Sequence, residues 1–228
     1  MFVQVESRRR PGPRWATLLI VVLCVGCFVA LSLMPLRQEL AWVMRWGTVP
    51  ARLFAGHEGA WWHGLANPDW ASLLTALFIH VSWIHLLTNM LFLVIFGLSA
   101  ERVMGSKRFF SLFLLGGVFA NLLGALTLST AHAPIIGCSG AVSAVVGVYL
   151  VMFPRARLGL VLPLGLFMEF VRVPASLLIG LWVLLQLLFT YAGPGFGAVV
   201  WWSHIAGFLF GVVFALLSRG AVERRQRR

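Results

Sequence analysis

Six long apolar segments constrain the fold of this chain more than any other feature. They cover roughly residues 15–34, 83–100, 109–128, 139–153, 175–191 and 201–218. Most of them approach the ~20 residues that a helix needs to cross a bilayer. Charged residues make up only 11% of the 228-residue chain, whereas about a quarter of a soluble domain is charged. The sequence therefore predicts an all-α, polytopic membrane protein with six transmembrane helices.

Positive charge lies at the ends of these segments. The formal net charge of +11 would by itself suggest a nucleic-acid partner. In a six-span topology, however, every Lys and Arg except Arg37, Arg45 and Arg52 falls on one side. Because basic loops stay in the cytoplasm, we expect both termini there, a lipid bilayer as the environment and no nucleic acid as a partner. No small-residue cleavage site follows the first segment, so we interpret it as a span and not as a signal peptide.

The spacing of the segments predicts one helical domain with short tails. We expect a basic cytoplasmic tail over residues 1–14, a membrane domain over 15–218 and a second basic tail over 219–228. The long loop over 35–75 is rich in tryptophan, which favours the membrane interface. Its apolar residues repeat at helical spacing: Leu36, Leu40, Val43 and Met44. We expect short amphipathic helices in the outer interface, with an ordinary solvated loop as the alternative.

Polar side chains open three of the predicted spans. The second span begins with "HVSWIHLLTN", the fourth with "GCSG" and the sixth with "HIAGFLFG". Polar groups inside spans are costly and usually mark function. All three segments start at the outer surface in this topology. We therefore expect a serine, several histidines and an amide to meet at one depth: Ser139, His80, His85, His204 and Asn89.

Ser139 has two interpretations. Serine is a preferred helix N-cap. A helix start also offers free N–H groups to an oxyanion, and Gly137 and Gly140 would let a substrate approach closely. The fourth span, at about 22 Å, is shorter than the ~30 Å hydrocarbon core, so Ser139 would lie below the outer surface. The irregular "PIIGC" before it must then be buried in protein or line a wet cavity, and we predict a water-accessible hollow around Ser139.

Small residues predict which helices touch. Gly207, Gly211 and Ala215 follow His204 on one helix face, and the fourth span carries a matching stripe of Gly140, Ser143, Ala144 and Gly147. If these stripes pack against each other, His204 meets Ser139 and can act as its general base.

The seven acidic residues exclude one class of enzyme. None lies in the outer half of a span, which argues against an intramembrane aspartyl protease. It also leaves a Ser–His dyad, with Glu58 and Asp69 as weak candidates for a third member. A metal site formed by His80, His85 and His204 is a further alternative, but no carboxylate or thiolate lies at the right depth. We predict no metal and no cofactor.

The three motifs together resemble those of the rhomboid intramembrane serine proteases, in their bacterial six-helix form, over roughly residues 66–218. The resemblance implies hydrolysis of peptide bonds in or beside transmembrane segments of membrane proteins, through an acyl-enzyme. It also implies a bacterial cytoplasmic membrane, with the site open to the extracytoplasmic side. It further implies that Ser139 is the nucleophile and His204 the base. The oxyanion hole would consist of His85, Asn89 and the Ser139 amide.

The resemblance gives other residues supporting roles. His80 is similar to a further histidine near the site, and Gly137 and Gly140 to the motif glycines. Gly207 and Gly211 are similar to the glycines that pack the sixth helix on the fourth. The fifth span resembles the family's lateral gate, and the loop "YAGPGFGAVVWW" its cap.

Three positions depart from the family's common pattern. Trp70 is followed by Ala71 where many members have arginine, so an arginine contact is missing or replaced. Ser143 stands where some members have an aromatic ring on the catalytic histidine, so another group must orient His204. Ser203 stands where alanine is usual. None of these changes removes a catalytic group.

Three rival functions remain beside the protease. One is a proteolytically silent rhomboid-like protein that binds membrane clients. Another is a transporter or channel, which the apolar cytoplasmic halves of the spans disfavour. The last is a specialised processing relative that acts on C-terminal sorting tails.

Overall fold

All six apolar segments form helices. The structure, a computed structural model, describes residues 14–54, 68–164, 167–192 and 201–227. The helices are α1 (Trp15–Ser32), α5 (Trp83–Phe92), η4 (Leu93–Gly97), α6 (Leu98–Met104), α7 (Ser106–Thr127), α8 (Ser139–Met152), α9 (Ala175–Ala192) and α10 (Trp201–Arg227). The π-helical turn η4 joins α5 to α6, so the second apolar segment is one long helix.

Four helices in the described part of the chain are long and apolar enough to cross a membrane: Trp15–Ser32, Trp83–Met104, Ser106–Thr127 and Trp201–Arg225. The stretches Ser139–Met152 and Ala175–Leu188 are apolar but shorter. The 14 residues of α8 cover about 21 Å at the usual rise, close to the length predicted. The protein is thus a mostly helical, multi-pass membrane protein.

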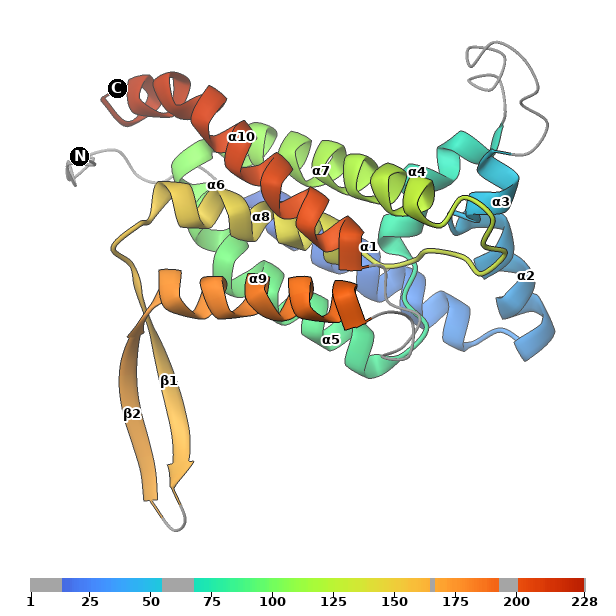
Figure 1. Ribbon diagram of the computed structural model, residues 1–228, viewed down its shortest axis with the longest axis horizontal. Helices are drawn as coiled ribbons and strands as arrows, with labels where there is room; N and C mark the ends of the chain where they lie inside the picture. The colour runs from blue at the N-terminus through green and yellow to red at the C-terminus, as the bar shows by residue number, and fades with distance from the viewer. Residues whose placement is uncertain (1–13, 55–67, 165–166, 193–200, 228) are drawn as a thin grey trace.

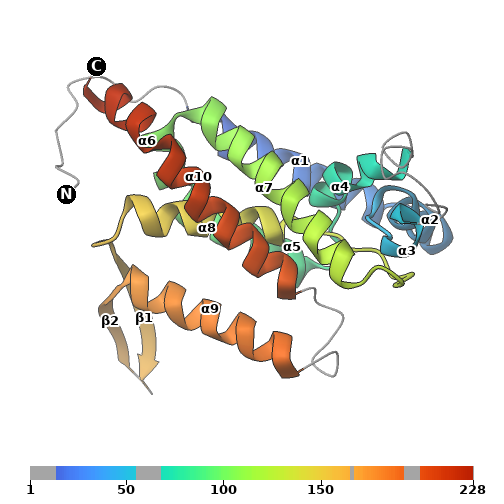
Figure 2. The same cartoon turned by 45° about the horizontal axis from the view of Figure 1, so that its top comes forward.

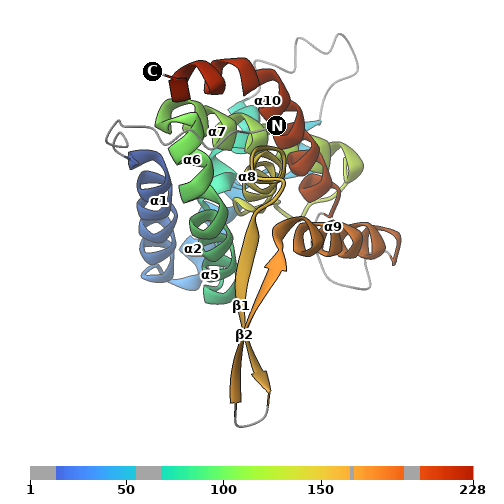
Figure 3. The ribbon, with the colours of Figure 1, turned by 90° about the vertical axis from the view of Figure 1, so that its left-hand side faces the viewer.

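Helix α8 lies in the middle of the bundle. Figure 3 views it almost end-on, with α5, α6, α7 and α10 around it. Every residue from 140 to 149 is buried. Many of these residues are Gly, Ala or Ser, which lets the surrounding helices come close. The core therefore forms around the helix that begins with Ser139.

A β-hairpin follows α8. Strands β1 (Arg157–Leu164) and β2 (Phe167–Pro174) pair antiparallel, with Arg157 opposite Pro174 and Leu164 opposite Phe167. The hairpin extends away from the helices (Figure 1). The all-α prediction is wrong for this segment. Its valines and leucines suit an extended chain, and Pro154 and Pro163 interrupt any helix.

The first loop contains short helices, as predicted. They are α2 (Leu36–Trp46), α3 (Pro50–Leu53), η2 (Pro68–Ala71), α4 (Ser72–Thr75) and η3 (Ala76–Phe78), while residues 55–67 lie outside the described part. On α2 Val43 is buried against the protein, and Leu40, Trp42 and Met44 are exposed. This amphipathic pattern agrees with an interfacial helix.

Four chain segments meet at one end of the bundle. Trp15, Met104, Ser106 and Arg225 line one cavity, so the starts of α1 and α7 lie beside the ends of α6 and α10. The carboxylate of Glu101 links α1, α6 and α7 at this end by hydrogen bonds. It accepts hydrogen bonds from the Ala16 and Thr17 backbone N–H groups at 2.9 Å and from the Thr17 and Ser106 hydroxyls at 2.6 Å. It therefore caps α1 from another helix.

Candidate active site

The small-residue stripes of α8 and α10 pack against each other, which confirms the predicted contact. A Cβ added at Gly207 would collide with the carbonyl oxygen of Gly140, and one at Gly211 with that of Ala144. A Cβ on Gly147 would in turn meet the Phe208 carbonyl. The two backbones are in direct contact, and α10 crosses α8 closely in Figure 2. This contact determines which residues meet at the starts of the two helices.

Ser139 and His204 face each other where α8 and α10 begin. The Ser139 Oγ lies 2.8 Å from the His204 Nε2, a hydrogen-bond distance between residues 65 positions apart. Both side chains are half-buried. Serine and histidine in this relation can form a nucleophile–base pair.

Ser139 is the first helical residue of α8 and not its N-cap. The N-cap is Cys138, whose carbonyl accepts from the Val142 N–H at 2.8 Å and whose side chain makes no capping bond. The interpretation of Ser139 as a cap is therefore wrong. Because the first N–H groups of a helix have no partner within it, the Ser139 amide remains available at the helix start.

The extended segment before Ser139 pairs with protein backbone. Thr48 and Ile135 exchange two hydrogen bonds at 3.0 and 2.8 Å, and the Gly137 N–H donates to the Ala76 carbonyl at 2.9 Å. Burial in protein thus satisfies these groups without water. A hollow around Ser139 does not follow from this segment, and it stays a prediction.

Contacts within the protein explain why the two motif positions, 137 and 140, are glycine. Gly137 has a φ of +96°, which side-chain-bearing residues rarely adopt, and a Cβ there would meet the His85 ring. A Cβ on Gly140 would meet Ala120. The space beside both residues is therefore filled by the protein itself, not left for a substrate as we expected from the sequence.

His80 and His85 lie together beside this loop. Their ring centroids are 4.9 Å apart in an edge-to-face arrangement. The His80 Nε2 lies 3.6 Å from the Cys138 sulfur, next in sequence to Ser139. His80 is fully buried. Burial lowers the pKa of His80 to about 4, and the neighbouring His85 contributes a smaller part of this decrease. The His80 ring is therefore neutral at pH 7.

Asn89 lies one helical turn after His85 on α5. It is buried, and its side-chain N–H donates to the His85 carbonyl at 3.0 Å. The His85 N–H in turn donates to the N-cap Ser82 hydroxyl at 3.3 Å. The start of α5 thus holds both residues through its own hydrogen bonds.

Two residues of α9 contact His204 that the sequence analysis did not single out. The Gln186 Oε1 lies 2.9 Å from the His204 Nδ1. The Trp182 ring lies beside the imidazole with centroids 6.5 Å apart and planes 26° apart. These residues supply the orienting group that Ser143 cannot provide, since the Ser143 hydroxyl donates to the Ser139 carbonyl at 2.7 Å. A buried amide within the apolar run "LWVLLQLLF" was the available signal.

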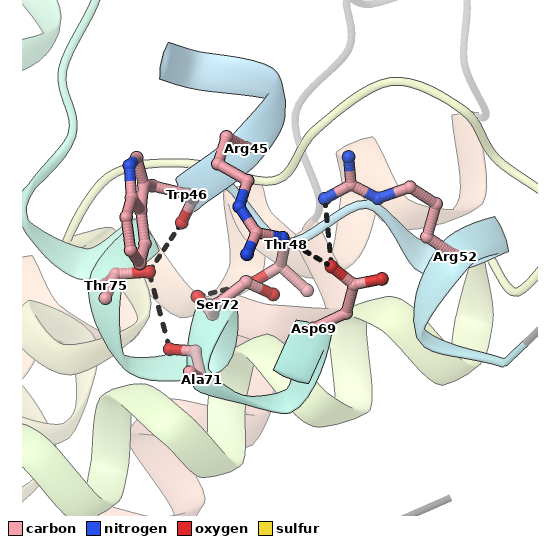
Figure 4. A network of polar contacts seen from close by, with 8 residues as sticks. All are labelled: Arg45, Trp46, Thr48, Arg52, Asp69, Ala71, Ser72 and Thr75. Carbon is pink, nitrogen blue, oxygen red and sulfur yellow. Dashed lines mark hydrogen bonds and ion pairs between the residues drawn. The ribbon is translucent and has the colours of Figure 1, made fainter. Parts of the chain in front are cut away.

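The candidate acid Asp69 is engaged elsewhere. Its Oδ1 lies 3.3 Å from the Arg52 Nη2 and 3.7 Å from the Arg45 Nη1 (Figure 4). An arginine contact is therefore present beside Trp70, although position 71 carries no arginine. Glu58 and most of the predicted cap loop lie outside the described residues. Within the described part, no group of three His, Cys, Asp or Glu side chains is suited to hold a metal.

Comparison with known proteins agrees with this arrangement. A family model, the Rhomboid domain, matches residues 67–220. The chain is similar to a putative rhomboid protease, YdcA, of Bacillus subtilis, with 34% identity over 39% of this chain and 44% of that protein. It is also similar to the mitochondrial rhomboid protein 1 of Saccharomyces cerevisiae, with 30% identity over 69% of this chain and 44% of the relative.

A chloroplastic relative extends this group. The rhomboid-like protein 11 of Arabidopsis thaliana is 33% identical over 66% of this chain and 53% of its own length. The chain thus spans about half the length of the curated relatives it matches. Since the family model covers well over half of the chain, this protein belongs to the rhomboid family.

Proposed function

We propose that this protein is an intramembrane serine endopeptidase that cleaves peptide bonds in or next to transmembrane segments of membrane proteins. The observation that carries the proposal is the 2.8 Å contact between the Ser139 Oγ and the His204 Nε2. The side chains come from two helices that touch backbone to backbone, so the pair is preorganised. Ser139 would act as the nucleophile and His204 as the general base.

The proposed reaction runs in two halves. His204 Nε2 takes the Ser139 proton as Oγ attacks the scissile carbonyl carbon, and the carbonyl oxygen becomes an oxyanion. His204 then gives the proton to the leaving amine, which leaves an acyl-enzyme on Ser139. Water repeats the steps, with His204 as base and then as acid, and releases the second product.

The oxyanion would form beside the start of α8. Ser139 is the first residue of α8, and the first N–H groups of a helix have no partner within it, as such a site requires. His85 and Asn89 would add side-chain donors. For this, the Asn89 amide must exchange its bond to the His85 carbonyl for one to the substrate, a rearrangement that catalytic groups often make on substrate binding. His80, buried and neutral, would support His85 by packing.

The proposed location is a bacterial cytoplasmic membrane, with both termini in the cytoplasm. His204 lies near the start of α10, whereas Arg225 lies near its end, in the cavity that Lys107 and Arg108 also line. The positive-inside rule places this basic end in the cytoplasm and the Ser–His pair toward the extracytoplasmic side. We retain the membrane domain as residues 15–218, between the two basic tails.

The deciding experiment compares the purified protein with a Ser139→Ala variant in detergent. Each receives a fluorophosphonate probe and a labelled transmembrane substrate. We expect the wild type to label and to cleave, and the variant to do neither. A wild type that folds but neither labels nor cleaves would favour the silent, client-binding relative. Cleavage by Ser139→Ala would show that another residue is the nucleophile.

A further inference from the structure

Gln186 contacts the ring nitrogen of His204 that Ser139 does not use. Its Oε1 lies 2.9 Å from Nδ1, while Nε2 faces Ser139 at 2.8 Å. A neutral histidine that is to accept a proton at Nε2 must carry its own proton on Nδ1. The side-chain carbonyl of Gln186 lies where it can accept that N–H. We propose that Gln186 is a positioning residue, which holds His204 in the tautomer and orientation that a general base needs.

This inference rests on the proposed protease function and adds a group to it. Serine hydrolases commonly place a carboxylate at the outer nitrogen of the base. An ionised carboxylate at membrane depth is expensive. A neutral amide avoids that cost and still offers an acceptor to the Nδ1 proton, which would be unfavourable to bury without a partner. Gln186 is buried, so water does not easily replace it.

The helix α9 holds His204 through two successive turns. Trp182 precedes Gln186 by four residues, which places both side chains on one helix face. Trp182 lies along one face of the imidazole, and Trp201 of α10 approaches edge-on with centroids 5.9 Å apart. The imidazole is thus fixed by a hydrogen bond and by ring contacts together.

The position of α9 therefore affects the catalytic pair. Figure 2 shows α9 beside α10 and outside the layer formed by α7, α8 and α10. Its first residue, Ala175, is tied to the bundle by the hydrogen bond from its N–H to the Ala156 carbonyl at 2.8 Å. Movement of the other end of α9 away from α10 would withdraw the acceptor from Nδ1. The protein would then have Ser139 and His204 in contact but His204 free to turn or to change tautomer.

The test uses two substitutions at one position and a matched control. Gln186→Met keeps the size of the side chain and removes the acceptor. Gln186→Glu restores an acceptor. Leu184→Met is the control, because this residue lies on the same helix and is exposed. Thermal unfolding in detergent identifies any variant that does not fold.

We expect Gln186→Met to lower kcat by about 10- to 100-fold with little change in KM, as small misplacements of a catalytic group do. Gln186→Glu should recover part of this loss. It should also move the acid limb of the pH–rate profile to higher pH, because a carboxylate favours the protonated imidazole. Leu184→Met should match the wild type. A folded Gln186→Met enzyme with wild-type kcat would overturn the inference.

A measurement on the unsubstituted protein gives an independent answer. Nitrogen-15 spectra of labelled histidine distinguish a protonated Nδ1 from a protonated Nε2. We expect His204 to carry its proton on Nδ1, and a protonated Nε2 would contradict the role of Gln186. Fluorophosphonate labelling of Ser139 separates this failure from that of the proposed function. If the wild type labels and cleaves but Gln186 has no effect, the protease proposal stands and the positioning role does not.

Discussion

The carbonyl oxygen of Gly140 occupies the place where a side chain on Gly207 would begin. This contact is the one nearest to the Ser139–His204 pair among the close approaches of α10 to α8, which also occur at Gly211 and Gly147. The distance between the two catalytic candidates is therefore set by a backbone-to-backbone approach that only glycine permits.

Replacement of Gly207 by valine should separate the two helices at this point. The new side chain meets backbone that cannot rotate away, so we expect destabilisation of about 3 kcal/mol or more and loss of Ser139 labelling. Thermal unfolding and fluorophosphonate labelling measure the two effects. Gly220→Ala on the same helix is the control, because a Cβ there meets only the tip of Arg224. Equal behaviour of the two variants would contradict the packing described above.

Replacement of Gly137 by alanine should impair catalysis more than stability. The positive φ of this residue costs an alanine about 1–2 kcal/mol. The added Cβ also presses on the His85 ring, a proposed oxyanion donor. We expect kcat to fall by about 100-fold or more, a typical loss when one such donor is removed. Gly26→Ala, whose Cβ meets nothing within 4 Å, should leave kcat unchanged.

The buried carboxylate of Glu101 should matter for stability and not for chemistry. It accepts four hydrogen bonds at the end of the bundle opposite to the Ser139–His204 pair. Glu101→Ala should lower the free energy of unfolding by about 2–4 kcal/mol, since it leaves the start of α1 without its cap. Labelling of Ser139 should persist at low temperature. Glu223→Gln, which breaks an exposed pair with Arg219, should change stability by less than about 1 kcal/mol.

Asp69 should prove dispensable for catalysis. Its carboxylate pairs with Arg52 and Arg45 in the first loop, so Asp69→Asn should retain kcat within about twofold. We expect a small loss of stability at low salt. The loss should be smaller at high salt, because these ion pairs are partly exposed and salt screens them. A large fall in kcat with unchanged KM would instead assign Asp69 a catalytic role.

The buried His80 should make the protein less stable in acid. The unfolded chain binds a proton near pH 6.5, whereas the folded protein binds one at His80 only near pH 4. Between these values the unfolded state holds more protons, so the free energy of unfolding falls as the pH falls. Unfolding measured from pH 7 to 4 should show a shallower decline for His80→Gln. An identical decline in both proteins would mean that His80 is not buried in the neutral form.

The sequence predicted the elements that carry the site, because each left a local pattern. The apolar segments marked the helices, and the glycine stripes of α8 and α10 predicted that Ser139 and His204 meet. Contacts between distant segments left weaker patterns. Gln186 is one amide in an apolar run, and its partner is visible only once α9 lies beside α10.

Two other features, the β-hairpin and the hydrogen bonds of Glu101, could not be predicted from the sequence for similar reasons. The hairpin over 157–174 is mostly apolar, with Arg157, Glu169 and Arg172 as its charged residues, and its sequence does not separate a strand from a loop at the membrane surface. Glu101 was visible only as a carboxylate outside the outer half of a span, while its backbone donors on α1, Ala16 and Thr17, lie 85 and 84 positions earlier in the chain. Contacts of this kind depend on the docking of helices and not on local propensity.

The reach of Glu101 has a consequence for the assembly of the protein during synthesis. The first turn of α1 is made well before the carboxylate that caps it, and Ser106 follows later still. Until the second long helix is made, the leading amides of α1 therefore lack this carboxylate as a hydrogen-bond acceptor. The cap of the first helix thus forms only when that helix packs against a helix that is synthesised after it.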